Sequence, residues 1–250
     1  MKKKSILITG AGAGIGADLV DKLSNIFFII AIDINKKSLE SLNKHQNPSI
    51  SCYECDLTNE NEINNLLKFV SDKFPKVYSL INCAGIYPTQ TIFEIDASSW
   101  DHVLKLNLRA PFLLTQGISK LMIKSNVKGS IINISSSAAK MSRPGICHYG
   151  ASKAGLEQLT KNLAIELANY EIRVNTIAPG LINTETVQNM SKNKSSLEHQ
   201  TKLNKIPLKR IGETDDLVGM VKYLLSPESS YCTGGVFPID GGITLGITHY

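Results

Sequence analysis

Short apolar runs, separated by longer stretches with helical spacing, recur along the chain. The runs are rich in Ile, Val and Phe and almost continuously apolar, which predicts strands buried on both faces of a sheet. They lie at residues 5–9, 27–33, 49–54, 78–82, 129–135, 172–178 and 235–240. Helices are expected between them, at residues 14–24, 36–44, 60–74, 98–124, 149–168 and 213–225.

The alternation of strands and helices predicts an α/β fold with a doubly wound, mainly parallel sheet and right-handed crossovers. No change in composition marks a second domain, so residues 1–250 are expected to form one domain. The most polar segment begins at residue 183 and follows a strand end. Because ligands bind beyond the carboxyl ends of the strands in such sheets, we expect a lid at about 183–210. A disordered insertion is the alternative.

Composition narrows the class of protein further. The net charge of +5 comes from scattered lysines without an arginine-rich stripe, which argues against nucleic-acid binding. The longest apolar run, residues 26–32, is too short to span a bilayer. The five cysteines are odd in number and lack zinc-site spacing, which favours reduced thiols and no bound metal. We therefore expect a soluble cytoplasmic protein without membrane or nucleic-acid partners.

A glycine-rich turn, "ITGAGAGIG", joins the first predicted strand to the first predicted helix. Glycines permit positive φ angles there and let a phosphate approach the backbone. The helix that follows offers free N–H groups and the positive end of its dipole. In this strand-to-helix context the turn predicts a site for the pyrophosphate of a dinucleotide.

The second predicted strand ends at Asp33. An acid at this position can accept hydrogen bonds from the adenosine ribose hydroxyls and would repel a 2′-phosphate, which predicts NAD rather than NADP. Lys36 and Lys37 point the other way, because a lysine could meet that phosphate. The structural alternative is that this Asp, or the Asn that follows it, caps the helix that begins at Lys36.

Further motifs occur in order along the chain. They are "TGAGAGIG" (9–16), "CDLT" (55–58), "NCAG" (82–85), "NLRAPF" (107–112), "NISSS" (133–137), "YGASK" (149–153), "PGLINT" (179–184) and "TGGVFPIDGG" (233–242). Together they resemble the short-chain dehydrogenase/reductase family over essentially the whole chain. The resemblance implies a single-domain, Rossmann-like, three-layer fold with a seven-stranded parallel sheet. It also implies a homotetramer in which helices 98–124 and 149–168 pack across an interface.

The resemblance further implies which residues hold the cofactor. Those for the pyrophosphate are Gly10, Gly14, Ile15 and Gly16, and those for the adenine are Asp56 and Leu57. Those on the adenosine side are Asn82, Ala84 and Gly85, and those at the nicotinamide end are Pro179, Gly180, Ile182 and Thr184. Cys83 replaces the second asparagine that is usual in the family, while Asn82 keeps the position that supports the backbone.

Tyr149 and Lys153 lie one helical turn apart, so their side chains share a face. Alone, this spacing also suits a packed aromatic and a solvated lysine. A nearby ammonium lowers the pKa of a phenol, so Tyr149 could act as general acid in reduction and general base in oxidation. The neighbouring His148 is expected at the surface or at a pocket edge.

The resemblance adds two residues to this pair. Ser136 precedes the tyrosine by the family's spacing of thirteen residues, which singles it out from Ser135 and Ser137. It would stabilise the developing alkoxide of the substrate. Tyr149 and Lys153 would also bind the cofactor, Lys153 at the nicotinamide ribose, and Asn107 would hold a proton-relay water through its backbone or its side chain.

These features predict an NAD(H)-dependent oxidoreductase that interconverts a secondary alcohol and a ketone. The C-terminal half is also typical of 3-oxoacyl-(acyl-carrier-protein) reductases, which makes an NADPH-dependent 3-oxoacyl-(acyl-carrier-protein) or 3-oxoacyl-CoA reductase the alternative. Val127 and Tyr170 stand where those enzymes place basic carrier-docking residues, although Lys124 and Lys128 lie nearby. A catalytically silent dinucleotide sensor is a third hypothesis, against which the complete set of four candidate catalytic residues argues.

Overall fold

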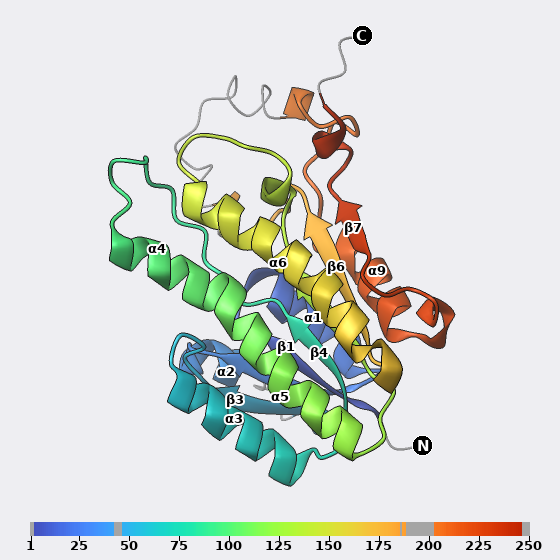
Figure 1. The fold of residues 1–250 in the computed structure, drawn as a ribbon. Coiled ribbons are helices and arrows are strands. Elements are labelled where there is room, and N and C mark those ends of the chain that lie inside the picture. The colour runs from blue at the N-terminus through green and yellow to red at the C-terminus, as the bar shows by residue number, and fades with distance from the viewer. Residues whose placement is uncertain (1–2, 43–46, 186, 189–202, 247–250) are drawn as a thin grey trace.

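Seven parallel strands form the centre of the computed structural model, which describes residues 3–42, 47–185, 187–188 and 203–246 (Figure 1). Their order across the sheet is β3-β2-β1-β4-β5-β6-β7. The strands are β1 (Ser5–Thr9), β2 (Phe28–Asp33), β3 (Ile50–Glu54), β4 (Val77–Asn82), β5 (Ser130–Ile134), β6 (Arg173–Pro179) and β7 (Val236–Ile239). Each predicted strand is confirmed to within one residue at either end, and the sheet is fully parallel, as expected.

Helices cover both faces of the sheet (Figure 1). They are α1 (Gly14–Ser24), α2 (Lys36–Leu42), α3 (Glu60–Lys73), α4 (Ala97–Leu104), α5 (Ala110–Lys124), α6 (Cys147–Leu167) and α9 (Asp215–Leu225). Helices α3, α5 and α6 lie on one face, and α1, α2 and α9 lie on the other. The result is the single-domain, three-layer α/β fold that the sequence predicts.

The two faces are built by alternation along each strand. In β1, Ile6 and Ile8 pack in one apolar cluster, which includes Leu19 of α1 and Val221 of α9. Leu7 points to the opposite side and joins a second cluster with residues of α3, α5 and α6. Because successive side chains of a strand point to opposite faces, a continuously apolar strand needs both layers of helices to bury it.

One helix differs from its prediction. Residues 98–124 were expected to form one regular helix, but α4 and α5 are joined by a π-helical turn, Lys105–Arg109. Such wide turns interrupt α-helices and are frequent at functional sites. Asn107 is fully buried in this turn, and its side chain is bonded to the loop after β4. The exception therefore falls at a predicted site residue.

Within the described ranges, no helix is long and apolar enough to cross a lipid bilayer. The same ranges bring together no group of three His, Cys, Asp or Glu side chains that could hold a metal ion. The lid predicted at about 183–210 lies largely outside the described residues and stays a prediction.

Candidate active site

The glycine turn after β1 forms a tight cradle at the start of α1. Gly10 and Gly14 have φ angles of +64° and +53°, which glycine adopts without strain. A methyl group on Gly16 would lie 2.0 Å from the Gly10 carbonyl oxygen, so the turn closes only around glycine. No side chain caps the first turn of α1, which begins after Ala13. Its N–H groups and positive dipole end fit the pyrophosphate that the sequence predicts here.

Thr9, the last residue of β1, ties this turn to the segment after β4. Its hydroxyl oxygen accepts hydrogen bonds from the backbone N–H groups of Cys83 (3.0 Å) and Ala84 (3.1 Å). Thr9 opens the glycine motif of residues 9–16, but the sequence prediction gave it no role of its own. The hydroxyl fixes the edge of the sheet at which several predicted cofactor residues meet.

Asp33 lies at the end of β2 and faces the glycine turn. One of its carboxylate oxygens accepts a hydrogen bond from the Gly12 N–H (2.8 Å), and the other accepts one from the Asn35 N–H (2.9 Å). The cap of α2 is Asn35, whose side-chain oxygen accepts from the Ser38 N–H (3.2 Å). Asp33 is therefore held as a fixed negative charge beside the turn and does not serve as the helix cap.

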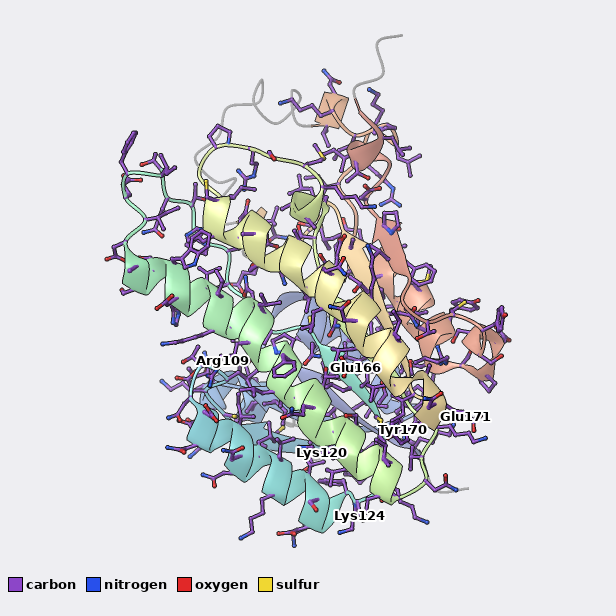
Figure 2. All side chains as sticks on the ribbon, viewed as in Figure 1. Arg109, Lys120, Lys124, Glu166, Tyr170 and Glu171 are labelled. Atoms are coloured by element: carbon purple, nitrogen blue, oxygen red, sulfur yellow. The ribbon has the colours of Figure 1, made fainter. Side chains whose placement is uncertain are left out.

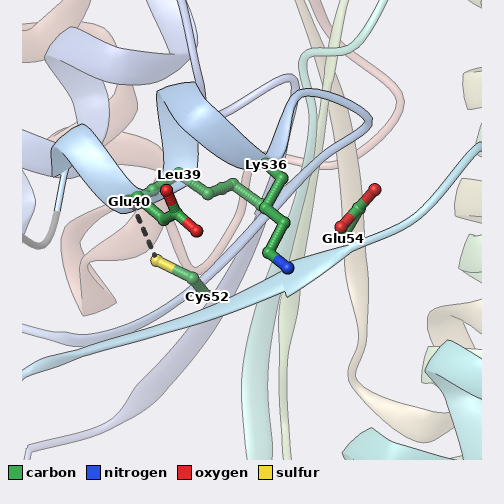
Figure 3. A pocket seen from close by; sticks show the side chains of 5 residues that line it. All are labelled: Lys36, Leu39, Glu40, Cys52 and Glu54. Carbon is green, nitrogen blue, oxygen red and sulfur yellow. Dashed lines mark hydrogen bonds between the residues drawn. The ribbon is translucent and has the colours of Figure 1, made fainter.

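Lys36, one of the two lysines that argued for a 2′-phosphate, lines a pocket of about 380 Å³ between α2 and β3, whereas Lys37 is exposed and does not line it. The pocket also contains Glu40 and Glu54, and the lysine side chain extends between their carboxylates (Figure 3). Cys52 closes one side by donating a hydrogen bond to the Leu39 carbonyl (3.5 Å). A phosphate drawn to Lys36 would therefore also meet two negative charges.

The predicted adenosine residues lie at the ends of β3 and β4. One oxygen of the Asp56 carboxylate accepts hydrogen bonds from the N–H and hydroxyl of Thr58, both at 2.8 Å, while Leu57 is buried. The Asn82 amide donates to Asn133 of β5 (2.8 Å), and its oxygen is buried without a partner among the described residues. Asn82 thus braces β4 against β5, the supporting position predicted for it.

The predicted nicotinamide residues follow β6 and return toward the glycine turn. A methyl group on Gly14 would lie 3.5 Å from a methyl carbon of Thr184. Ile182 forms an isolated bridge with Gly212, and Gly180 packs against Asp240 so closely that a methyl group would lie 2.7 Å from its backbone. The fold therefore brings the segment after β6 and the turn after β1 together, although they are far apart in the sequence.

Lys153 points from α6 into the middle of this edge. Its side chain is 5% exposed, and its ammonium donates a hydrogen bond to the Ile134 carbonyl (2.9 Å). The ammonium nitrogen lies 5.8 Å from the centre of the Tyr149 ring. Burial lowers the pKa of Lys153 to about 8, because the charged form loses its water.

Tyr149 is the partner of Lys153 on α6. The lowered pKa expected from the Lys153 ammonium is not found: burial raises the pKa of the Tyr149 phenol, and the Ser136 hydroxyl and the charge of Arg143 offset this only in part. The phenol is therefore protonated at neutral pH and can donate a proton. The structure brings Ser136, Tyr149 and Lys153 together, as the spacing predicted.

The three adjacent serines have different surroundings. Ser135 is buried, and its hydroxyl bonds to the Lys153 carbonyl (3.3 Å) and the Glu157 carboxylate (3.1 Å). Ser136 accepts a hydrogen bond from the Ala138 N–H (3.1 Å) and is half-buried beside the phenol. The geometry thus leaves Ser136, and not Ser135, in reach of a substrate oxygen.

Asn107 completes the predicted group, with its side chain fully committed as a donor. Its amide nitrogen donates to the Ile86 carbonyl (2.9 Å) and the Ser152 hydroxyl (3.2 Å), and its oxygen accepts from the Ile86 N–H (2.9 Å). A methyl group on Gly85 would lie 3.2 Å from this oxygen and 3.4 Å from the Lys153 ammonium. A role in holding a water would therefore fall to the main chain of the π-helical turn.

The prediction for His148 was wrong. The side chain is fully buried instead of lying at the surface or a pocket edge. Its Nδ1 accepts a hydrogen bond from the Tyr149 N–H (2.9 Å), so Nε2 carries the proton and donates it to Gln90 (3.1 Å). Burial lowers its pKa, which keeps the ring neutral. The loop after β4 covers this histidine, and no local pattern in the sequence reveals that contact.

A family model described as "Enoyl-(Acyl carrier protein) reductase" matches residues 10–244, nearly the whole chain. The chain belongs to the short-chain dehydrogenase/reductase family. A curated relative, 3-oxoacyl-(acyl-carrier-protein) reductase FabG from Thermotoga maritima, is 35% identical over 98% of this chain and 99% of its own length. The family assignment makes the protein an oxidoreductase.

Two solved structures of the family share the fold closely. A 4-hydroxyisoleucine dehydrogenase complexed with NADH is 34% identical, with a TM-score of 0.92 over 97% of this chain and 99% of that chain. A gluconate 5-dehydrogenase from Burkholderia cenocepacia, in complex with NADP and tartrate, is 26% identical, with a TM-score of 0.91 over 99% and 97%. Structures of this short-chain dehydrogenase/reductase fold thus hold either form of the nicotinamide cofactor.

Proposed function

We propose that the protein transfers a hydride between NAD(H) and a secondary alcohol or ketone. The observation that carries the proposal is the group on and beside α6, where the Lys153 ammonium lies 5.8 Å from the centre of the Tyr149 ring and the Ser136 hydroxyl acts to lower the pKa of the phenol. The nicotinamide cofactor, when bound, supplies or accepts the hydride. The glycine turn, Asp33 and the segment after β6 provide residues that fit it.

The chain's own residues handle the proton. In reduction, the Tyr149 phenol donates its proton to the carbonyl oxygen, and in oxidation its phenolate removes the proton from the hydroxyl. Lys153, 5.8 Å from the centre of the Tyr149 ring, favours the phenolate while it is protonated, which is below its pKa of about 8. The Ser136 hydroxyl donates a hydrogen bond to the oxygen that becomes negative in the transition state.

The preference for NAD rests on Asp33. Its fixed carboxylate lies beside the glycine turn, where a 2′-phosphate would meet a like charge. Lys36 could offset this, but it lies between Glu40 and Glu54. The protein should therefore give a higher kcat/KM with NADH than with NADPH, and a strong NADPH preference would overturn this part of the proposal.

The alternative is a 3-oxoacyl-(acyl-carrier-protein) reductase, as the Thermotoga maritima relative is named. An acidic carrier would need basic residues at the ends of α5 and α6. Lys128 is paired with Glu171 (2.5 Å), and Lys124 lies at the end of α5 (Figure 2). This pairing favours a small-molecule substrate over a docked acidic carrier.

The test is a panel of ketones and secondary alcohols assayed in parallel with both cofactors. Tyr149→Phe should lower kcat by about 10²–10⁴, the usual contribution of general acid–base catalysis. Tyr170→Phe, at an exposed tyrosine near the end of α6, is the matched control and should be fully active. NADH binding, followed by its fluorescence, should be unchanged in Tyr170→Phe and should be retained in Tyr149→Phe, because phenylalanine removes only the hydroxyl among many cofactor contacts.

Each contrary outcome has a clear meaning. Full turnover by Tyr149→Phe would contradict the mechanism. A preference for acetoacetyl thioesters among active substrates would establish the alternative. Tight NADH binding without turnover of any substrate would point to a silent dinucleotide sensor.

A further inference from the structure

A second aromatic ring and a guanidinium lie beside the phenol of Tyr149. The Tyr87 ring, from the loop after β4, meets the Tyr149 ring edge-on, with 4.7 Å between the ring centres. The guanidinium carbon of Arg143 lies 5.2 Å from the centre of the Tyr87 ring. The guanidinium carbon of Arg143 is therefore at most about 10 Å from the centre of the Tyr149 ring.

The loop that carries Arg143 is held in place by the loop that carries Tyr87. The Gln90 N–H donates to the Gly145 carbonyl (3.0 Å), and its side chain accepts from the buried His148 (3.1 Å). Gly145 has a φ angle of +83° and packs so closely that a methyl group would lie 2.8 Å from Thr89. These contacts hold the loop at Gly145, two residues after Arg143, through buried and backbone groups.

The Arg143 side chain has no carboxylate partner among the residues that the structure describes. It is exposed, and a guanidinium packed on an aromatic ring by its face keeps its N–H groups free at its edge. That fork of N–H donors matches the two oxygens of a carboxylate. An unpaired cation at this distance from the catalytic phenol is suited to bind the far end of a substrate.

We infer that Arg143 binds the carboxylate of a short oxo acid or hydroxy acid whose carbonyl or hydroxyl carbon meets Tyr149. The inference rests on the proposed function and names its substrate class. The separation suits an acid with a few carbons between the two groups, at about 1.5 Å per bond. The phosphate of a coenzyme A or carrier-protein arm lies many bonds from its thioester and would fall beyond this distance.

Matched pairs of substrates test the inference. Pyruvate, acetoacetate and 4-oxopentanoate place a carboxylate at increasing distances from a ketone, and their methyl esters remove only its charge. Arg143→Met should raise the KM for the best acid by about 10–100-fold, because a charge-assisted hydrogen bond is lost. The KM for the ester should not change. Lys140→Met, at an exposed lysine on the same loop, is the control and should leave both values unchanged.

A binding measurement gives a readout that does not depend on turnover. Calorimetric titration of the protein with malonate, in the presence of NADH, should show binding to wild type and to Lys140→Met but not to Arg143→Met. Equal losses for acid and ester in Arg143→Met would overturn the inference, because the residue would then act on Tyr149 or on the loop. A raised KM for acetoacetyl-coenzyme A in Arg143→Met, with the KM for the acids unchanged, would also overturn the inference.

The inference and the proposed function fail in different ways. Wild type that reduces the neutral esters, but neither reduces nor binds any acid better than its ester, would show that Arg143 is not a carboxylate site. The proposed oxidoreductase activity would then stand. If no ketone or alcohol is turned over, the proposed function fails. Malonate binding that depends on Arg143 then still supports the site.

Discussion

Lys153 brings a positive charge into a position that water hardly reaches. The lowered pKa, about 8 against an ordinary value of 10.5, means that folding disfavours the protonated amine. A difference of this size corresponds to about 3 kcal/mol of unfavourable free energy at pH 7. The proposed chemistry needs the ammonium, so we expect the protein to be less stable because of it.

Lys153→Met should therefore stabilise the protein at pH 7 while abolishing turnover. Between pH 8 and about 10.5 the folded protein loses the proton while the unfolded chain keeps it, so wild-type stability should rise relative to the variant. Urea unfolding at pH 7 and pH 10 measures this. A stability difference between the two proteins that does not change with pH would contradict the assigned burial of the charge.

Alanine variants of Ser135 and Ser136 should differ in activity and in stability. Ser136→Ala should lower kcat by about 10²–10³, the effect of losing one donor to a developing oxyanion, with little change in melting temperature. Ser135→Ala should reduce the stability by about 1–3 kcal/mol, because the buried Glu157 carboxylate loses its donor. Ser135→Ala with full stability but no activity would reverse the assignment.

Spacing and resemblance were sufficient to place Ser136, Tyr149 and Lys153, because a helix start and a strand end fix their relation. Thr9 and His148 were not predictable in the same way. The role of Thr9 depends on hydrogen bonds to residues more than seventy positions away. The burial of His148 depends on a loop that folds over it. Contacts between distant segments leave no local pattern.

At the scale of elements, the connection from β1 to β4 depends on one hydroxyl. Thr9→Val keeps the shape of the side chain and removes the acceptor of two backbone N–H groups. It should cost about 2 kcal/mol of stability and weaken NADH binding, because Gly10 packs directly on Ala84. Thr9→Ser is the control that keeps the hydroxyl. Urea unfolding and an NADH titration decide, and a valine variant as stable as wild type would contradict the role.

The strands were predictable almost to the residue, since apolar runs bounded by polar turns mark them without ambiguity. The break between α4 and α5 has a local signal that the prediction of one helix over 98–124 overlooked. Pro111 lies in the first turn of α5, and a proline inside a continuous helix removes a backbone hydrogen bond and crowds the preceding turn. The hydrogen bonds of Asn107 to the Ile86 backbone, by contrast, are tertiary contacts without a local pattern.

At the scale of the whole molecule, the outer face of α5 and α6 is partly apolar. Ile165 of α6 is 76% exposed, and Phe112 and Ile123 of α5 are each 39% exposed. The same two helices carry charged residues, with Lys120 and Lys124 on α5, Glu166 on α6 and Arg109 just before α5 (Figure 2). We expect this face to pair with a second copy of the chain, and a homotetramer is the assembly that the family resemblance implies.

Light scattering of the purified protein tests this expectation. Wild type should have the mass of an oligomer, and Ile165→Glu should reduce it by placing a charge in the apolar face. Ile26→Glu, at a 50% exposed isoleucine after α1, is the control and should leave the mass unchanged. A monomeric wild type would rule the assembly out.

The strand order also sets the sequence in which the sheet can be completed as the chain is made. Strand β1 lies inside the sheet, with β2 and β3 added outward on one side and β4 to β7 on the other. Every later strand can pair with one that is already present, so the sheet can grow in step with synthesis from the N-terminus. The β1 edge that faces β4 must nevertheless wait for residue 77, with its backbone N–H and C=O groups unpaired. Aggregation during synthesis should therefore be worst for chains that end just before β4.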